Sequence, residues 1–559
     1  MRTLAFSRSG WLVPALLAGL WAATARAGEP ANPPSEAPRA VAGDPEATLQ
    51  KGLDLERRKN WSAALQVYID ANEQWPSRQD FRQRKRLCEI HHRLARRYQD
   101  QSFRNVLLRL SREKSFDLFD EMVERIESHY VDPVPLAPLI RRGLDNLEVA
   151  LRDPTFPFLA INAPQATPAR LSWLREQLRV RRDHLVVDSR DAARAELQAV
   201  CDLARQAIGV DPAPVVLEFV FATCDVLDDY TTYLTPDKLD DMFAMIDGNF
   251  VGLGVELKLD DEGLRLVGVI RGGPASEAGL KAGDRIVAVG GKSVRGLGLD
   301  EAAGQLQGTE GTPIEISVLR SDKSTHDLKL VRRHVEVESV AQAKIVEPLS
   351  GVGYIQLAGF QKSSGEELDR AVSDLQKQGM RYLILDLRGN PGGLLNVAVE
   401  IADRFVDRGV IVSTRGRAPG QTQVYRAHPD VPFTMPVAVL IDHDSASASE
   451  ILAGALQELG RAIVIGDRSY GKGSVQSIFE LRSAPAGLKL TTAKFYSPQN
   501  RAYSEQGVTP DVKVTVRAKP AADAEESGDG PSPEFGDPGT DEVLKMALMQ
   551  ARRQLTTAR

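Results

Sequence analysis

The hydrophobic and polar residues between Val437 and Gln476 follow a strand, turn, helix, strand and loop pattern. The apolar runs Val437–Ile441 and Ala462–Ile465 each predict a buried strand. Between them, the spacing of five apolar residues predicts a helix with one apolar face that ends before Gly460. These residues are Ile451, Leu452, Ala455, Leu456 and Leu459. The turn before this helix holds Ser445, Ser447 and Ser449. A hydroxyl there lies where unpaired backbone N–H groups and the helix dipole stabilise a developing negative charge.

The same alternation of buried strands and helices extends over the second half of the chain. It begins near Ser339 and includes a strand, a glycine-rich turn and a helix in RYLILDLRGNPGGLLNVAVEIADRF, residues 381–405. Repeated alternation of this kind predicts a layered α/β domain with parallel strands. We place this domain at residues 338–517.

Helical patterns dominate outside that domain. The segment Phe116–Tyr130 is amphipathic and lies within a predicted helical segment, 113–249. Residues 145–220 form an insertion in it, to which the pattern assigns no role. Residues 518–540 are rich in Ala, Asp, Glu, Gly and Pro and predict a flexible linker before a C-terminal helix at 541–559.

The N-terminal part, residues 46–112, predicts a helical hairpin. It resembles one tetratricopeptide-type repeat in Gly52, Trp61, Ala64, Tyr68, Ala71 and Pro76. Because about three repeats are usually needed to bury a core, a two-helix cap on the remaining chain is an equal alternative.

Residues 78–114 are basic. They suit either a solvated helix face or peripheral contact with anionic lipid or a polyanionic envelope component.

Composition sets the broad class of the protein. The 559 residues are 42% hydrophobic and 26% charged, with a net charge of −6, which indicates several globular domains and no nucleic-acid partner. Three cysteines without a CxxC pair favour buried thiols over a disulfide framework. The eight histidines show no HExxH spacing, so we expect neither a metal nor a cofactor.

The first 27 residues have the three parts of a secretory signal peptide. Arg2 and Arg8 precede the apolar run Trp11–Ala23, and Ala25-Arg26-Ala27 forms a cleavage site. An uncleaved membrane anchor is the alternative. Residues 28–45 predict a disordered linker. We therefore expect an exported protein of the periplasm or cell envelope.

Three motifs carry a family resemblance. SASASEILAGAL, GKGSVQ and DLRGNPGG, in residues 386–476, resemble the C-terminal processing peptidases, or tail-specific proteases, which use a Ser–Lys pair. The resemblance implies a multidomain α/β protein with a ClpP/crotonase-like catalytic domain. It implies that Ser447 is the nucleophile, Lys472 the general base and Gln476 the residue that orients the lysine. It also implies an oxyanion hole made by Ala448 with Gly392 or Gly393.

Residues 250–337 resemble a PDZ domain. FVGLGVEL contains Gly252, Leu253, Gly254 and Val255, where glycines let backbone N–H groups turn toward a bound carboxylate. GGPASEAGLKAGDRIVAVGGKSV follows as a turn-and-strand signature. A PDZ groove adds an extended chain end as a strand, so we expect polypeptides with free C-termini as partners.

The proposed base needs an unusual pKa. An ordinary lysine has a pKa of about 10.4, so about one amine in 2,500 is neutral at pH 7. Burial lowers that pKa, and Gly471 and Gly473 allow the backbone to turn the Lys472 stem inward beside Val475 and Ile478. Neutral Lys472 would then take the proton of Ser447.

Several alternatives stay open at this stage. The serine-rich turn could be a simple helix cap, with Ser445 as the capping residue. His443 and Asp444 could form a Ser–His–Asp triad with Ser447. The protein could also be a peptide-binding scaffold without activity, or an adaptor that acts through its N-terminal helices. The motif Tyr503-Ser504-Glu505 departs from the family wording, and the oligomeric state is left open.

Overall fold

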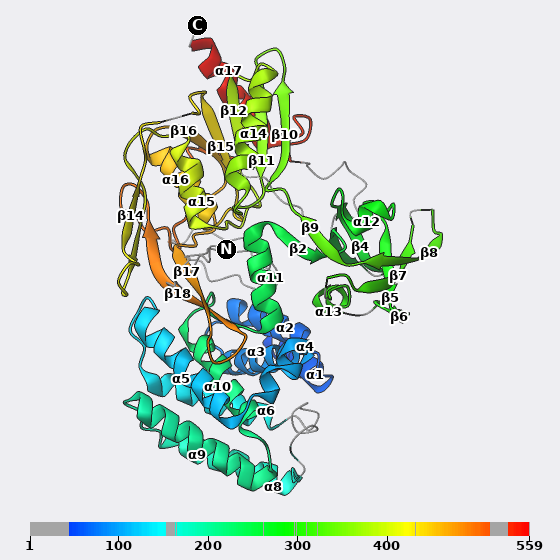
Figure 1. Cartoon of the computed structure of the whole chain (residues 1–559), viewed down its shortest axis with the longest axis vertical. Helices are drawn as coiled ribbons and strands as arrows, with labels where there is room; N and C mark the ends of the chain where they lie inside the picture. The colour runs from blue at the N-terminus through cyan, green and yellow to red at the C-terminus, as the bar shows by residue number, and fades with distance from the viewer. Residues whose placement is uncertain are drawn as a thin grey trace, which may run out of the picture.

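Three regions make up the computed structural model (Figure 1): helices at the bottom, a PDZ-like domain at the right and an α/β domain at the top. The described residues are 44–152, 163, 165–260, 262–295, 297, 299–308, 310–320, 322–430, 432–514 and 535–557. The predicted signal peptide, 1–27, lies outside them. So does the predicted linker at 28–45 except for its last two residues, and Pro45 already begins helix α1.

The first helices form a tightly packed hairpin. They are α1 (Pro45–Arg57), α2 (Trp61–Gln74) and α3 (Gln79–Gln99). Gly52 of α1 lies so close to Tyr68 of α2 that a Cβ atom on the glycine would come within 2.4 Å of the Tyr68 ring. The absence of a side chain therefore allows the two helices to approach. Small and aromatic residues fill the core: Ala64, Tyr68, Ala71, Phe81 and Cys88.

The remaining helical region forms a single core that includes the insertion. After the short α4 (Gln101–Asn105) come α5 (Arg112–His129), α6 (Leu136–Ala150), α8 (Pro168–Asp183), α9 (Arg190–Ile208) and α10 (Pro212–Leu227). Residues 145–220 thus supply α8, α9 and part of α10. Helix α10 is apolar on nearly all sides, so it is buried between its neighbours.

The PDZ-like domain has its own hydrophobic core, which includes Leu264, Leu266, Ile286, Ile316 and Val318. Its sheet contains β3 (Val255–Asp260), β4 (Gly263–Val269), β5 (Arg285–Val289), β6 (Lys292–Ser293), β7 (Pro313–Leu319) and β8 (Thr325–Val331). The short helices are α12 (Pro274–Glu277) and α13 (Leu299–Gly304). The chain enters and leaves the domain through one antiparallel pair, β2 (Asn249–Gly252) and β9 (Arg333–Glu336).

The main sheet of the α/β domain has the predicted parallel strands. Its order is β10 (Val340–Glu347), β11 (Val352–Leu357), β12 (Tyr382–Asp386), β15 (Val437–Ile441), β16 (Ala462–Gly466) and β19 (Val512–Lys513), with only β10 antiparallel. Successive residues of β12 point to opposite faces. Leu383 and Leu385 contact the core beneath α14 (Ser364–Lys377), α15 (Leu395–Asp403) and α16 (Ala448–Glu458). Tyr382 and Ile384 face α17 (Glu542–Thr557).

A second sheet joins the α/β domain to the helices. It contains β1 (Thr232–Leu234), β18 (Gly487–Tyr496), β13 (Val410–Gly416) and β14 (Gln423–Arg426), and β17 (Ser474–Glu480) also pairs with β18. Strand β1 directly follows α10, so part of the helical region lies in this sheet. The turn between β17 and β18 reaches α5, where Glu121 accepts hydrogen bonds from the backbone of Arg482 and Ser483. Helix α11 (Pro236–Asp247) then leads to the PDZ-like domain (Figure 1).

Of the predicted flexible linker at 518–540, the structure describes only the last six residues. Residues 535–540 form turns beside the α/β domain, and Gly536 is buried there. The ring of Phe535 lies 4.3 Å from the guanidinium of Arg388. Asp541, predicted as the first residue of the helix, accepts a hydrogen bond from Leu544 N and caps α17, which begins at Glu542.

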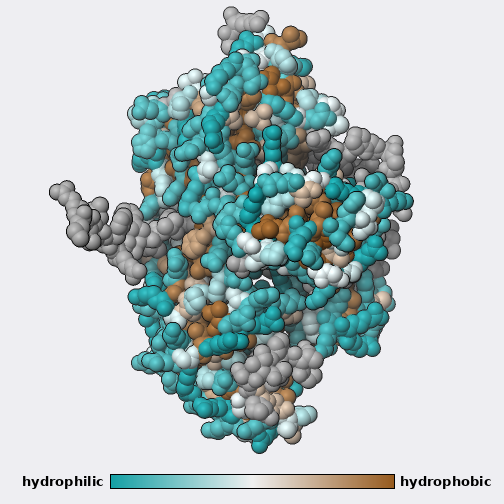
Figure 2. Space-filling view, turned by 45° about the vertical axis from the view of Figure 1, so that its right-hand side comes forward, coloured by the Kyte–Doolittle hydropathy of each residue, from teal (hydrophilic) through white to brown (hydrophobic). Residues whose placement is uncertain are grey.

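Two further expectations concern the surface and the cysteines. Cys88, Cys201 and Cys224 are buried and unpaired, as predicted. None of the described helices combines the length and apolar character that crossing a bilayer requires. The face in Figure 2 is mostly hydrophilic, with hydrophobic residues in small separate areas.

Candidate active site

Ser447 lies at the sharp turn between β15 and α16. It is fully buried, and its backbone has φ 57° and ψ −112°, a conformation that a residue with a side chain rarely adopts. A strained turn between a strand and a helix is also typical of the nucleophilic serine in hydrolases. The Ser447 Oγ makes no hydrogen bond with any described residue. The hydroxyl is therefore not committed to a structural role.

Glu450, which the sequence analysis did not single out, ties the serine turn to the lysine loop. Its Oε2 accepts hydrogen bonds from Ser447 N at 2.7 Å and Lys472 N at 2.9 Å. Its Oε1 accepts from Gly471 N at 2.7 Å and Ser469 Oγ at 2.6 Å. Burial raises the pKa of Glu450 to about 7, although the four hydrogen bonds that its carboxylate accepts act to lower this pKa. The spacing Ser447-x-x-Glu450 is a capping-box signature and could have revealed this residue.

Lys472 has the environment that the sequence predicted for a base. Its side chain is buried, and burial lowers the pKa of the amine from its ordinary 10.5 to about 7, helped by the nearby charge of Lys489. The Nζ lies 4.8 Å from the centroid of the Tyr230 ring. Tyr230 follows α10 and reaches the site because β1 pairs with β18. No local spacing in the sequence signals Tyr230 or Lys489.

Gln476 lies near the start of β17, and only the nitrogen of its side-chain amide makes hydrogen bonds with described residues. Its Nε2 donates to Ser474 Oγ at 2.9 Å and to Thr491 Oγ1 at 3.4 Å, whereas its buried Oε1 has no partner among the described residues. The structure thus brings the backbones of Ser447 and Lys472 together on Glu450. It does not show a hydrogen bond between the serine hydroxyl and the lysine amine.

The glycine loop lies directly against Ser447. A Cβ atom on Gly392 would come within 2.9 Å of the Ser447 Cβ and 3.0 Å of Ala448 N. The two candidate glycines differ in their hydrogen bonds. Gly392 N donates to Asn390 Oδ1 at 2.9 Å, whereas the N–H groups of Gly393 and Ala448 donate to no described residue.

The root of this loop is clamped by the C-terminal segment. Arg388 donates to both carboxylate oxygens of Asp541, at 2.9 and 2.6 Å, and to those of Asp386. All three side chains are buried, and Tyr354 donates to Asp386 at 2.7 Å. A bidentate buried pair of this kind holds its partners in one orientation. Asp541 therefore fixes the base of the glycine loop, although it is 153 residues away in sequence.

If the glycine loop supplies the oxyanion hole, as the family resemblance implies, replacing Asp541 with Asn should lower kcat about tenfold and leave KM unchanged. The Arg388 guanidinium would lose one ionic partner, and the loop beside Ser447 would lose its fixed position; removing an oxyanion donor outright costs about 100-fold or more. Steady-state hydrolysis of a fluorogenic peptide measures both constants. Glu542→Gln, which changes the exposed neighbouring residue, is the control. A kcat equal to that of the unmodified protein would show that the clamp does not position the loop.

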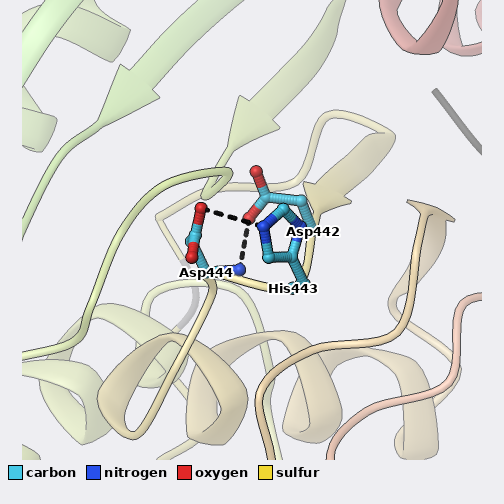
Figure 3. Close-up of side chains that lie close together, drawn as sticks. All are labelled: Asp442, His443 and Asp444. Atoms are coloured by element: carbon cyan, nitrogen blue, oxygen red, sulfur yellow. Dashed lines mark hydrogen bonds and ion pairs between the residues drawn. The ribbon is translucent and has the colours of Figure 1, made fainter. Parts of the chain in front are cut away.

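The geometry argues against both alternative interpretations of the serine turn. Ser445 does not cap α16, because its Oγ donates to Leu387 O at 2.8 Å and Ser447 occupies the capping position. His443 is exposed and pairs with Asp444 (Figure 3). Ser447 is buried, and its Oγ has no hydrogen-bond partner among the described residues, so His443 does not bind it. Asp442, His443 and Asp444 lie close enough to share a cation. However, Asp442 Oδ1 already accepts from the backbone N–H groups of Gly389, Asp444 and Ser445, which makes it a loop-stabilising residue.

The predicted carboxylate loop lies between β2 and β3 of the PDZ-like domain. It contains Gly252, Leu253, Gly254 and Val255, and Gly254 has φ 77°. Leu253 O accepts from Ala275 N at 2.8 Å, and Gly254 O accepts from Ile270 N at 2.9 Å. These bonds hold the loop carbonyls toward the domain. Its role in binding a chain end stays a prediction.

Comparisons with known proteins match both domains. The model of peptidase family S41 matches residues 351–514, and a PDZ domain model matches residues 265–320. A carboxy-terminal-processing protease of Bartonella bacilliformis is 40% identical over 295 residues, which are 52% of this chain and 67% of that protein. A carboxy-terminal processing protease of Bacillus subtilis is 32% identical over 327 residues, or 58% and 68% of the two chains.

Among solved structures, the photosystem II D1 C-terminal processing protease aligns with a TM-score of 0.39 and 26% identity. The alignment covers 72% of this chain and 93% of that chain.

Proposed function

Because this chain belongs to the C-terminal processing peptidases of family S41 and carries a PDZ domain, we propose that it cleaves exported or envelope proteins at or near their C-terminal tails. In this proposal Ser447 is the nucleophile and Lys472 the general base. The observation that carries it is a buried, strained serine and a buried lysine of low pKa on the two sides of Glu450.

The proposed reaction passes through an acyl-enzyme. The neutral Lys472 amine takes the Ser447 proton as Oγ attacks the scissile carbonyl carbon. The same amine then gives this proton to the leaving nitrogen as the C–N bond breaks. Water, deprotonated by Lys472, hydrolyses the ester and frees Ser447. Because Ser447 Oγ has no hydrogen-bond partner among the described residues, the Lys472 amine would move to within hydrogen-bond distance of it for the first step. Gln476 Oε1, which also lacks a partner among those residues, would accept a hydrogen bond from the amine.

The developing oxyanion would be held by two backbone donors. We assign Gly393 N–H and Ala448 N–H, because both lack another acceptor and lie on either side of the contact between Gly392 and Ser447. The Gly392 N–H is already used by Asn390. Ala448 N is the first helical donor of α16, so the helix dipole adds to its effect.

Substrate selection would come from the PDZ domain. An extended chain end would add as a strand beside β3, with its carboxylate at the loop of residues 252–255. Export to the periplasm or cell envelope is part of the proposal and depends on the N-terminal pattern alone. Contact of the basic helical surface with a membrane, or of the N-terminal hairpin with a partner protein, likewise stays a prediction.

Labelling with a serine-reactive fluorophosphonate tests the nucleophile. We expect labelling of the full chain and none of Ser447→Ala, with Ser324→Ala in the PDZ domain labelled as the unmodified protein is. A peptide with a free carboxylate should be cleaved about tenfold faster than its amidated form, because the charge-assisted hydrogen bonds to the carboxylate are lost. Labelling of Ser447→Ala at the normal rate would remove Ser447 as nucleophile. Binding of peptides without any hydrolysis would favour the scaffold alternative.

A further inference from the structure

A cationic cavity lies between the N-terminal hairpin and the rest of the helical region. Its volume is about 570 Å³, and it is bordered by α2, α3, α6 and the end of α10. These helices lie together in the lower half of Figure 1. Five basic side chains line it: Arg82, Lys85, Arg86, Arg141 and Arg142. Three acidic side chains also line it, so its net charge is positive.

The acidic side chains are already engaged. Asp145 accepts hydrogen bonds from Arg86 at 2.9 Å and from Arg182 at 3.3 Å. Asp225 accepts from Arg93 and, at 3.3 Å, from Asn146. Arg182 and Arg93 do not line the cavity, and their charges neutralise part of the negative charge of Asp145 and Asp225. The third acidic side chain, Glu89, pairs with Lys85 at 3.6 Å. Because five basic and only three acidic side chains line the cavity, and two of those three also bind arginines outside it, an excess of positive charge remains.

Arg142 is the unusual group in this cavity. Only 9% of the residue is exposed, and its buried Nε has no hydrogen-bond partner among the described residues. Its Nε lies 3.9 Å from Asp225 Oδ2, beyond hydrogen-bond distance. Burial lowers the pKa of Arg142. Leaving the buried Nε–H group of a guanidinium without a hydrogen-bond acceptor is costly, and a bound oxyanion is a group that satisfies it.

A second unsatisfied group lines the same cavity. Asn72 belongs to α2, and its buried side-chain Oδ1 has no partner among the described residues. The two ends of an asparagine amide can exchange places, so the side chain can present N–H donors to an anion. Two orphan polar groups from different helices thus meet in one basic cavity.

The cavity is also connected to the active site along the chain. Asp225 and Val226 line the cavity, and the segment that follows them contains Asp228 and Tyr230. Asp228 accepts a hydrogen bond from Tyr230 N at 2.7 Å, which fixes the turn. The Tyr230 ring lies beneath the Lys472 amine. A shift at the end of α10 would therefore move the group that contacts Lys472.

We propose that this cavity binds a phosphate group, and that its occupancy is transmitted to Lys472 through the end of α10. Guanidinium groups and an excess of positive charge fit a dianion with several acceptor oxygens. Free phosphate compounds and the headgroup of a phospholipid share this chemistry. The second part of the proposal rests on the proposed function of Lys472, whereas the binding itself does not.

Titration calorimetry of the full chain with inorganic pyrophosphate tests the site, at constant ionic strength. We expect saturable binding with a Kd below about 1 mM, and at least tenfold weaker binding by Arg142→Gln, which is about 1.4 kcal/mol. Arg408→Gln, at a side chain that is 90% exposed in the α/β domain, is the matched control. Arg82→Gln, at an exposed wall of the cavity, gives a second variant whose folding is not at risk; it should bind about threefold more weakly.

Two further measurements separate the sources and the coupling. Arg142-dependent sedimentation with vesicles of anionic phospholipid, but not of phosphatidylcholine, would identify a headgroup as the ligand; pyrophosphate binding without sedimentation would identify a free phosphate compound. Pyrophosphate should change kcat for peptide hydrolysis at least twofold, but not in Arg142→Gln. Absence of binding to both probes, or binding by Arg142→Gln and Arg82→Gln as tight as that of the unmodified protein, overturns the site. Binding with an unchanged kcat overturns the coupling alone.

Discussion

Replacement of Lys472 by methionine should lower kcat about 10,000-fold, the size of loss seen when a catalytic base is removed. Methionine keeps the length and burial of the side chain but cannot accept the Ser447 proton. The fold should survive, because methionine fills a similar volume and its sulfur can also contact the Tyr230 ring. Peptide hydrolysis and fluorophosphonate labelling measure the loss, and peptide binding should be unchanged.

The pH dependence of the same variant provides an independent check. Above a pH of about 7 the folded Lys472 is neutral, so kcat/KM of the unmodified protein should rise through pH 7. Between about pH 7 and 10.5 the unfolded lysine holds a proton that the folded one lacks. The unfolded state therefore binds more protons, and the contribution of Lys472 makes the free energy of unfolding rise with pH across that window. Lys472→Met should lose this contribution.

The matched control is Lys377→Met, at an exposed lysine of α14. It should leave both the rate and its pH profile unchanged. If Lys472→Met retained more than about a tenth of the activity, or if the unmodified rate were flat between pH 5 and 9, Lys472 would not be the base.

Replacement of Glu450 by glutamine should reduce both stability and activity. A glutamine side chain has one acceptor oxygen, so donors now facing Oε1 or Oε2 would face an amide N–H₂ group instead. Leaving such buried groups unpaired costs about 2 to 4 kcal/mol of unfolding free energy. The Ser447 turn and the Lys472 loop would lose their shared anchor. We expect kcat to fall about 100-fold, because small displacements of reacting groups cost this much.

Urea denaturation and peptide hydrolysis measure the two effects, with exposed Glu480→Gln as control. The sign of the pH effect is opposite to that of Lys472. Between its ordinary pKa of 4.5 and about 7, folded Glu450 holds a proton that the unfolded residue has lost. Its contribution to stability is therefore present at acid pH and is lost as the pH rises to 7. A Glu450→Gln protein with normal stability and activity would reduce Glu450 to an ordinary helix cap.

Local sequence patterns predicted the strands, the serine turn and the lysine loop, because each depends on neighbouring residues. They could not predict groups that long-range pairing brings in. Tyr230 reaches Lys472 only through the register of β1 on β18, where Thr232 pairs with Lys489. Asp541 reaches Arg388 only because α17 covers the outer face of the main sheet.

Two further features could not be predicted from the sequence, and each has a physical reason. The glycines at 392 and 393 are equivalent in sequence, and only the side chain of Asn390 distinguishes them by binding one N–H. The insertion at 145–220 shows no family pattern, and ion pairs hold part of it in place. Glu148 of α6, for example, pairs with Arg175 and Arg179 of α8. Glu148 is buried, whereas the two arginines are partly exposed, and no local periodicity indicates that these residues pair.

The pairing of β1 with β18 also has a consequence for the newly made chain. Apolar residues of the β17–β18 hairpin, including Leu481, Leu488 and Leu490, complete the core that the helices from α3 to α10 build. A ribosome that has just produced α10 has still to synthesise about half of the protein before these residues exist. Until then, part of the apolar surface of these helices stays exposed to solvent. The active site can therefore form only after the β17–β18 hairpin has been synthesised.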